Sequence, residues 1–373
     1  RTLTVLNWAT ALANDARAKN GQSPVDLEQL PPDDPEVYRL ICTGRTTALF
    51  QLESRGMQEL IQRLQPDHFE ELVALVALFR PGPLQSGMVD DFINRKHGRE
   101  PVVYLHDSIR SILEPTYGVI LYQEQVMEIA QQLAGFSLGS ADLLRRAMGK
   151  KKPEEMAQQR AVFIEGSSKN GVDSGQADHI FNLMERFAGY GFNKPHSVGY
   201  ALVAYQTAWL KHYYPSDFMA AVLSADMQNT DKVVVNIDES RVMGLTVKTP
   251  SINQGEYRFL ADEDGQINYG LGAVKGLGEG PVGDIVSERE RGGAFNDLYK
   301  FCERVDSRRV NRRAVEALIG SGALDELVPL DEDIDYCRAL LLANQSDAVK
   351  LAEMLYGLYS LPQLTIAKVH GAA

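Results

Sequence analysis

The sequence predicts a mainly α-helical protein with small β elements, divided into more than one domain. Its 373 residues are enough for two or three compact domains. Apolar residues recur at helical spacing through most of residues 1–240. After about residue 245, glycines and turn-forming residues become frequent and a hairpin pattern appears. We therefore place a domain boundary near residue 240.

Helices dominate the first 240 residues. Ser54 is a good N-cap for one of them, Gly149 is a typical C-terminal stop for another, and Pro215 ends a third. Two short apolar runs, 47–52 and 119–122, are typical of buried strands. The predicted helices cover much of 1–30 before a loop at Asn20-Gly21, then 36–42, 55–64, 66–78, a stretch from about 123, 140–148, 153–167, 176–187 and 196–214.

The last third of the chain has a mixed pattern. Runs at 252–259 and 266–269 flank Asp262-Glu263-Asp264-Gly265, which is a typical hairpin turn. A glycine-rich segment follows at 270–283. Further helices are predicted at 281–291, at 310–319 and, in the tail, at 339–355.

The composition is that of an ordinary globular protein, with 44% hydrophobic and 24% charged residues. A formal net charge of −12 argues against a surface that coats nucleic acid generally, but it leaves room for a local basic cleft. Three separate cysteines predict neither a metal nor a disulfide framework and fit a cytoplasmic protein. No apolar run approaches the roughly 20 residues of a membrane span. Because the chain begins with Arg1 rather than Met, we expect it to be an internal part of a longer protein.

The strongest local feature is a basic cluster, Arg145, Arg146, Lys150, Lys151 and Lys152, with five positive charges in eight positions. The two arginines fall in the last turn of a predicted helix, where cations interact favourably with the helix dipole. A solvated helix end would explain isolated charges, but like charges this close repel at roughly 1 kcal/mol per near pair in water. An anionic ligand would relieve that repulsion. We therefore interpret the cluster as an anion site, with a nucleoside triphosphate as the obvious candidate.

A second anion-binding pattern lies at the predicted start of the 196–214 helix. Asn193 can cap that helix, and the free amides around Lys194 to Ser197 then form a natural phosphate site. Lys194 adds a point charge, while His196 and Ser197 add side-chain donors. Tyr200 lies one turn after His196 on the same helix face, where it could stack on a base or sugar or belong to the core.

Two further positions carry weaker signals. Arg80-Pro81-Gly82-Pro83 predicts a rigid loop, which makes Arg80 a candidate for a phosphate or template contact. Gln123 stands at the predicted start of a helix and has no specific signal by itself.

Residues 269–280, YGLGAVKGLGEG, resemble a helix-hairpin-helix motif. In that motif a Gly-hydrophobic-Gly turn joins two helices and its amides hold one DNA phosphate, which needs glycine because the backbone must come close to the phosphate. Lys275 supports the electrostatic case, and the segment lacks the Gly-Lys-Ser/Thr ending of a P-loop. A poorer second copy is predicted at 317–323. Four arginines precede that copy: Arg308, Arg309, Arg312 and Arg313.

Five segments carry a family resemblance. They are FQLES at 50–54, LFRPGPL at 78–84, YGVILYQEQ at 117–125, LRRAMGKK at 144–151 and YGFNK at 190–194. In this order and spacing, the sequence resembles the family of bacterial DNA polymerase III alpha subunits, which are C-family replicative DNA polymerases. The similarity covers about residues 1–327, and the motifs are jointly very specific.

The resemblance implies a domain order. Residues 1–80 would be the C-terminal part of the palm, and 81–240 the fingers, which bind the incoming nucleotide. Residues 241–327 would be a tandem helix-hairpin-helix region that binds DNA, and 328–373 a weakly matched helical tail. The implied activity is a replicative DNA-directed DNA polymerase that adds dNTPs to a primer 3′ end by two-metal phosphoryl transfer with Mg²⁺.

The resemblance also implies roles for residues and partners. The nucleotide-binding residues would be Arg145, Arg146, Lys150, Lys151, Lys194, His196 and Ser197, with Arg80, Gln123 and Tyr200 nearby. The DNA-binding residues would be Lys275, Gly276, Gly278, Arg312 and Arg313. The implied partners are primer-template DNA, dNTPs, and the sliding clamp, proofreading exonuclease subunit and clamp loader of a full holoenzyme, with no membrane partner.

The sequence departs from the family pattern in ways that bear on activity. In the family, the metal-binding aspartates precede the residues that match Arg1, so we expect neither a catalytic nor a metal-ligating residue in this chain and no activity of the chain alone. Pro195 and Gly199 replace the small residues expected there, whereas Lys194 favours the replicative type over error-prone paralogues. Two alternatives stay open: a non-catalytic helix-hairpin-helix DNA-binding fragment, and the product of an incomplete polymerase gene.

Overall fold

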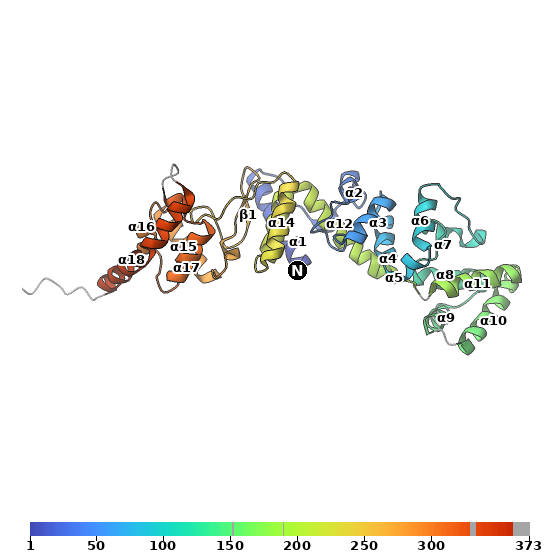
Figure 1. The fold of residues 1–373 in the computed structure, drawn as a ribbon. Helices are drawn as coiled ribbons and strands as arrows, with labels where there is room; N and C mark the ends of the chain where they lie inside the picture. The colour runs from blue at the N-terminus through green and yellow to red at the C-terminus, as the bar shows by residue number, and fades with distance from the viewer. Residues whose placement is uncertain (151–152, 189, 329–332, 361–373) are drawn as a thin grey trace, which may run out of the picture. The chain divides into compact units, whose positions relative to one another are not determined.

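The computed structural model describes residues 1–150, 153–188, 190–328 and 333–360. They form two compact units. Unit 1 combines Arg1–Val25 with Tyr213–Ala373, and unit 2 is Asp26–His212. Helices dominate both units, and the described residues contain one two-stranded sheet, so the predicted mainly α-helical class with small β elements is confirmed (Figure 1).

Unit 2 holds the helices in the middle of the chain. Its core between α8 and α11 is built from apolar side chains one helical turn apart, such as Val126, Ile129 and Leu133 on α8, which meet Phe163 and Phe181 from the following helices. The helices are α2 (Pro35–Cys42), α3 (Arg55–Leu64), α4 (Phe69–Leu78), α5 (Pro81–Gln85), α6 (Met88–Lys96), α7 (Arg110–Leu113), α8 (Gln123–Ala134), α9 (Leu138–Lys150), α10 (Pro153–Lys169), α11 (Ser174–Ala188) and α12 (Lys194–Tyr213), with 3-10 turns at Leu27–Gln29, Asp107–Ile109 and Glu114–Thr116.

Several local predictions in unit 2 are wrong for identifiable reasons. The predicted strand at 47–52 is a series of turns, because Ala48 and Gln51 adopt left-handed backbone conformations that a strand cannot contain. The predicted loop after Arg80 becomes the short helix α5, with proline in its first turn, where the missing N–H costs nothing. The predicted strand 119–122 is reduced to a single bridge, and α9 runs past Gly149, its predicted stop.

Unit 1 packs α1 (Thr2–Lys19) and α14 (Thr230–Val242) against α13 (Pro215–Asp226). The predicted hairpin exists but is short: Leu260 pairs with Asn268 and Ala261 with Ile267, around the expected acidic turn. The predicted strand 252–259 is absent from the described residues, and the chain there forms turns. The remaining elements are β1 (Leu260–Ala261), β2 (Ile267–Asn268), α15 (Glu279–Gly292), α16 (Leu298–Arg304), α17 (Arg312–Ser321) and α18 (Ile334–Ser360), with 3-10 turns at Leu271–Ala273 and Asp325–Leu327.

The second apolar core lies in unit 1 and joins the C-terminal helices. Val282 and Ile285 of α15 pack with Phe301 of α16 and with Val315 and Leu318 of α17. This core fixes the segment that the sequence predicts to bind DNA. Among the described residues, no helix is both long and apolar enough to span a membrane.

A half-buried carboxyl group at the start of α13 makes the stability of unit 1 depend on pH. Burial raises the pKa of Asp217 to about 6, above the roughly 3.9 of an unfolded aspartate. Asp217 therefore stabilises the fold in its protonated form, and this contribution is lost as the pH rises through about 6. We expect Asp217→Asn to raise the melting temperature at pH 8 by more than at pH 4.5. Equal shifts at the two pH values, measured by calorimetry, would contradict this account.

Candidate functional site

The starts of α8 and α12 lie side by side because the segments in front of them pair. Tyr122 and Phe192 form a parallel β-bridge. The Phe192 amide donates to Leu121 O at 3.2 Å, and the Gln123 amide donates to Phe192 O at 2.9 Å. This pairing, between residues about 70 positions apart in sequence, brings two of the predicted site segments together in unit 2.

The guanidinium of Arg145 links α9 to this pair. Its Nε and Nη2 donate to Asp142 Oδ1 at 3.0 and 2.8 Å, and its Nη1 donates to Gln123 Oε1 at 3.0 Å. The Gln123 side chain in turn donates through Nε2 to Gly191 O at 3.0 Å. Two residues predicted to bind nucleotide, Arg145 and Gln123, therefore contact each other, and Gln123 also contacts the turn before α12.

Arg146 shares the same carboxylate but is oriented differently. Its Nε lies 2.8 Å from Asp142 Oδ2. Its side chain is 62% exposed, compared with 28% for Arg145, so much of its guanidinium faces solvent. Hydrogen bonding from Arg145, with the charges of both arginines, lowers the pKa of Asp142. Among the residues that the structure describes, the two arginines thus share one carboxylate.

The start of α12 is held by carboxylate and amide side chains of the protein itself. The Lys194 amide donates to Glu124 Oε2 at 2.9 Å, and the His196 amide donates to Asn193 Oδ1 at 3.0 Å. Asn193 also donates from its side chain to Glu124. The Lys194 ammonium lies 3.3 Å from Glu70 Oε2. A phosphate near α12 would therefore meet side chains first, since the amides of Lys194 and His196 already have acceptors.

A ladder of rings runs along α12. Ring centroids are separated by 5.3 Å from Phe50 to Tyr200, by 4.4 Å from Tyr200 to His196 and by 5.5 Å from His196 to Phe192. At its end the guanidinium of Arg80 lies 4.3 Å from the centre of the Phe192 ring, a cation–π geometry. Arg80 also donates to Tyr190 O at 2.9 Å, and burial lowers its pKa.

The remaining predicted nucleotide-binding residues differ in accessibility. The hydroxyl group of Ser197 is buried and has no hydrogen-bond partner among the described residues, so it does not line the surface of this site. Lys151 lies outside the described residues, and for Lys150 only its place at the end of α9 is described.

The sequence interpretation missed the carboxylates of the site: Asp142, Glu70 and Glu124. The local part of the signal was available, because Asp142 lies three and four residues before the two arginines, at the spacing of helical ion pairs. Glu70 and Glu124 give no such signal, because their cationic and amide partners are far away in sequence. The charge repulsion inferred for the basic cluster is thus relieved in part by Asp142.

Within the described part of unit 2, side chains of the kinds that bind metal ions lie close together at one further place. Ligand atoms of Asp67, His68 and Glu71 all lie within 4.8 Å of one another. However, the Lys96 ammonium lies 3.1 Å from Asp67 Oδ2 and donates to both oxygens of Glu71. The Lys96 ammonium already contacts both carboxylates and compensates one of their two charges. The cluster therefore does not fit a divalent ion, and no chemical step is assigned to a metal there.

The first helix-hairpin-helix segment exposes its backbone. Gly276 has a left-handed φ of +92°, which favours glycine. A Cβ atom built at Gly276, Gly278 or Gly280 would meet no other atom within 4 Å, so the backbone before α15 and in its first turn is open to a ligand. Lys275 is exposed beside it. The predicted DNA-contacting residues of this hairpin therefore lie at one accessible turn.

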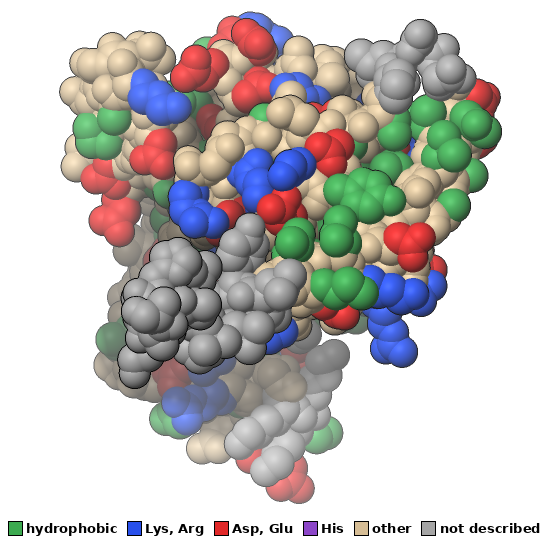
Figure 2. Space-filling model, turned by 90° about the vertical axis from the view of Figure 1, so that its left-hand side faces the viewer, with side chains coloured by type: hydrophobic (Ala, Val, Ile, Leu, Met, Phe, Trp, Pro, Cys, Tyr) green, Lys and Arg blue, Asp and Glu red, His purple; other side chains and the backbone are tan. Residues whose placement is uncertain are grey.

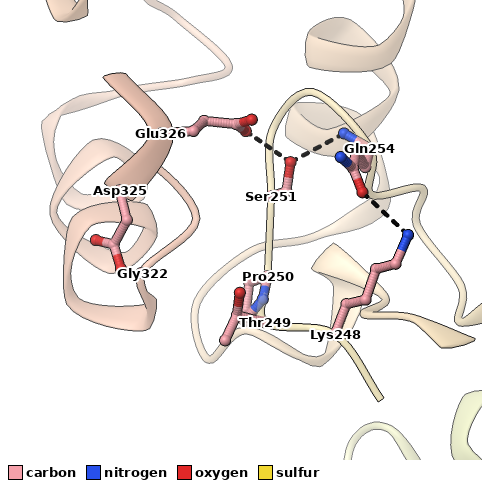
Figure 3. A pocket seen from close by; sticks show the side chains of 8 residues that line it. All are labelled: Lys248, Thr249, Pro250, Ser251, Gln254, Gly322, Asp325 and Glu326. Atoms are coloured by element: carbon pink, nitrogen blue, oxygen red, sulfur yellow. Dashed lines mark hydrogen bonds between the residues drawn. The ribbon is translucent and has the colours of Figure 1, made fainter. Parts of the chain in front are cut away.

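The predicted second copy at 317–323 stays a prediction, and the structure places it at the end of a helix. Residues up to Ser321 belong to α17, and Gly322 is its left-handed C-cap, whose amide donates back to Ile319 O. Gly322 thus ends the helix, whereas Gly320 lies within it. This ending borders a cavity of about 390 Å³ that Asp325 and Glu326 line, and Glu326 accepts a hydrogen bond from Ser251 at 2.6 Å (Figure 3). Carboxylates at this position disfavour a phosphate.

Two of the arginines that precede residues 317–323 are nevertheless accessible to a ligand. Arg312 and Arg313 are exposed in the first turn of α17, and neither forms an ion pair within the part of the chain that the structure describes. Cations are unfavourable at a helix N-terminus, so stability of the helix does not explain them.

On the face of unit 1 seen in Figure 2, basic side chains alternate with acidic ones and do not form one continuous patch.

Two family models match the chain. Residues 2–171 match the bacterial DNA polymerase III alpha subunit finger domain, and residues 244–331 match a helix-hairpin-helix motif. The finger-domain match includes the segment that the sequence interpretation assigned to the palm, and the compact units divide the chain differently again. The predicted domain limits of 1–80, 81–240, 241–327 and 328–373 therefore stay predictions.

Curated relatives match nearly the whole chain. The DNA polymerase III subunit alpha of Vibrio cholerae is 60% identical over 357 residues, which are 94% of this chain and 30% of the relative. Those of Pseudomonas aeruginosa and Escherichia coli K12 are 58% and 57% identical, over 95% of this chain and 31% and 30% of their own lengths. The chain thus spans about 30% of the length of the curated relatives that it matches.

Proposed function

Because the chain belongs to the family of bacterial DNA polymerase III alpha subunits, we propose that it provides the incoming-nucleotide and DNA-backbone binding of a replicative DNA polymerase. In this proposal the whole enzyme adds dNTPs to a primer 3′ end. Residues outside this chain hold its Mg²⁺ ions, which stabilise the charge of the transferred phosphoryl group. The chain alone then binds its ligands without catalysing the reaction.

The pairing of residues 121–123 with Phe192 carries the nucleotide part of the proposal. This pairing joins the start of α8, which Arg145 contacts, to the start of α12. Cations from α9 and α12 therefore belong to one site in unit 2. In this site Arg146 and Lys194 offer charged groups to phosphates. Tyr200 and His196, within the ring ladder, offer faces on which a base or sugar can stack. The predicted Lys150 and Lys151 would extend the same site.

The helix-hairpin-helix region carries the DNA part. The open glycine turn at Gly276 and Gly278, with exposed Lys275, suits one backbone phosphate. Arg312 and Arg313 place positive charge at the N-terminus of their own helix, where the helix dipole disfavours it. An anionic partner would compensate this unfavourable interaction. We propose primer-template duplex as that partner. For the whole polymerase, family membership alone supports three protein partners: the sliding clamp, the exonuclease subunit and the clamp loader. It also supports a cytoplasmic location.

DNA binding by this region has a measurable signature. Each contact between a cation and a phosphate contributes about one unit to the salt dependence of the affinity and does not depend on base sequence. We expect Lys275→Ala and Arg312→Ala each to weaken duplex binding for any sequence and to reduce the slope of log K against log salt by about 1. Lys300→Ala, in which an exposed lysine paired with Glu303 is lost, is the matched control. A slope that is unchanged in the Lys275 and Arg312 variants would contradict the assignment.

A non-catalytic DNA-binding fragment without a nucleotide role is the competing function, and the accessible hairpin is the observation that favours it. Titration of the chain with a dNTP and Mg²⁺, and separately with duplex DNA, discriminates between the two. Saturable binding of both ligands supports the polymerase proposal. Binding of duplex alone supports the competing function.

A further inference from the structure

A cavity of about 850 Å³ lies in unit 1, between the second half of α1, the start of α13 and the hairpin of β1 and β2. Both α1 and β1 pack against α13. The Ser216 hydroxyl donates to Gly265 O at 2.6 Å, and the Lys19 ammonium lies 3.7 Å from Glu263 Oε1, so the hairpin is tied to both helices. None of the residues that line this cavity belongs to the proposed nucleotide or DNA sites.

Carboxylates dominate the charge of this cavity. Of the described residues that line it, four are acidic and one, Lys19, is basic. Asp262 and Glu263 each have a lysine partner. In contrast, Asp15 and Asp217 form no ion pair within the part of the chain that the structure describes. The cavity therefore has two uncompensated carboxylates, one from α1 and one from α13.

The fold alone does not account for the carboxyl group of Asp217. This side chain is half-buried, and burial raises its pKa to about 6. Near neutral pH the group is therefore mostly ionised, although it has lost part of its hydration. An ionised group that is partly removed from water without a partner destabilises the fold. A bound cation would offset that loss.

The arrangement of the cavity fits an extended organic cation better than a metal ion. A divalent metal needs several oxygen atoms close together. In the described part of the chain, three or more possible ligand atoms lie within 4.8 Å of one another only in the cluster at residues 67–71, which is elsewhere. Leu12 and Ala16 give this cavity apolar surface, and Tyr213 and Tyr214 add aromatic rings, whose faces attract ammonium groups.

We propose that this cavity binds a linear aliphatic diamine or polyamine, whose ammonium groups pair with Asp15 and Asp217. The methylene chain between these groups then lies against the apolar and aromatic side chains of the cavity. A ligand held by charge at both ends should bind more tightly than a monoamine of the same length. This site is independent of nucleotide and DNA binding, so it stands or fails separately from the proposed function.

The first experiment measures the affinity of the chain for putrescine by calorimetry, with butylamine as the monoamine. Putrescine should bind saturably and more tightly than butylamine. Asp15→Asn and Asp217→Asn should each weaken putrescine binding by about tenfold, the loss expected for one charge-assisted hydrogen bond. Glu290→Gln removes an exposed carboxylate of α15 that does not line the cavity, and it should keep wild-type affinity. Equal losses in all three variants, or no saturable binding of putrescine, would overturn the proposal.

The pH dependence of binding gives a second test. An ammonium group pairs with the ionised form of Asp217, so putrescine affinity should rise from about pH 5 to about pH 7.5, as this carboxyl loses its proton. The charged groups that face Asp217 across the cavity are Asp15 and Lys19 of α1 and Asp262 and Glu263 of the hairpin. Asp217→Asn keeps all four and should flatten the rise. An equally steep rise in Asp217→Asn would contradict the pairing.

A change of shape without a change of charge separates a ligand inside the cavity from general attraction to an acidic protein. Ala16 lines the cavity, so Ala16→Leu should fill part of it and weaken putrescine binding. Ala11→Leu, at an exposed position of α1 that does not line the cavity, is the matched control and should bind as the wild type does. Wild-type affinity in Ala16→Leu would place the amine outside the cavity and reject the proposal.

Discussion

Replacing Arg146 and Lys194 together by alanine is expected to reduce the affinity of the chain for a Mg²⁺-bound dNTP by at least about 100-fold. A hydrogen bond to a charged group contributes about 1.5–3 kcal/mol, and each 1.4 kcal/mol is about tenfold in affinity. Arg146 and Lys194 come from α9 and α12, and both are partly accessible. Equilibrium titration monitored by calorimetry measures the change.

The matched control removes the same charge elsewhere in unit 2. Arg55 and Lys169 are exposed and pair with the exposed Glu59 and Glu165, so Arg55→Ala with Lys169→Ala lowers the net charge equally without touching the site. This control should keep wild-type affinity. If it weakened dNTP binding as much as the Arg146 and Lys194 pair, a general field effect would replace the assigned contacts. If neither double variant changed the affinity, the nucleotide assignment would fail.

The largest effect on stability is expected at the buried pair of Lys96 and Glu71. The side chain of Glu71 is fully buried and that of Lys96 is 6% exposed, and Tyr117 also donates its hydroxyl to Glu71 Oε1 at 2.5 Å. Lys96→Met leaves the carboxylate without its cation, which typically costs about 3–5 kcal/mol. Urea unfolding followed by circular dichroism measures this change in the free energy of unfolding.

A double variant tests the reason for that loss. Adding Glu71→Gln to Lys96→Met removes the buried charge, so much of the lost stability should return. Lys169→Met, which breaks an exposed pair with Glu165, should stay within about 0.5 kcal/mol of wild type. A double variant no more stable than Lys96→Met would show that the cost comes from packing and not from an uncompensated charge.

Much of the helical architecture could be predicted from the sequence, because its signals are local. Ser54 caps α3 by accepting from the Met57 amide, and proline opens α10 as expected. The errors have a common cause. Residues 47–52 have an apolar, strand-like composition, yet the left-handed conformations at Ala48 and Gln51 come from tertiary packing, which composition does not encode.

The sequence predicted the cations of the candidate site but not the residues that contact them. The basic run at α9 and the lysine at the start of α12 are visible in the sequence. The pairing of Leu121 and Gln123 with Phe192, and the contact of Glu70 with Lys194, join residues that are distant in the chain. Only folding brings such residues together, so a single sequence gives no sign of which carboxylate faces which cation.

Hydrogen–deuterium exchange with and without a Mg²⁺-bound dNTP tests the central claim, that unit 2 binds nucleotide between α9 and the start of α12, most directly. Added nucleotide should slow exchange at 144–150 and at 190–200 and leave the hairpin at 274–279 unchanged. Protection confined to the hairpin, or no protection at saturating nucleotide, would contradict the account.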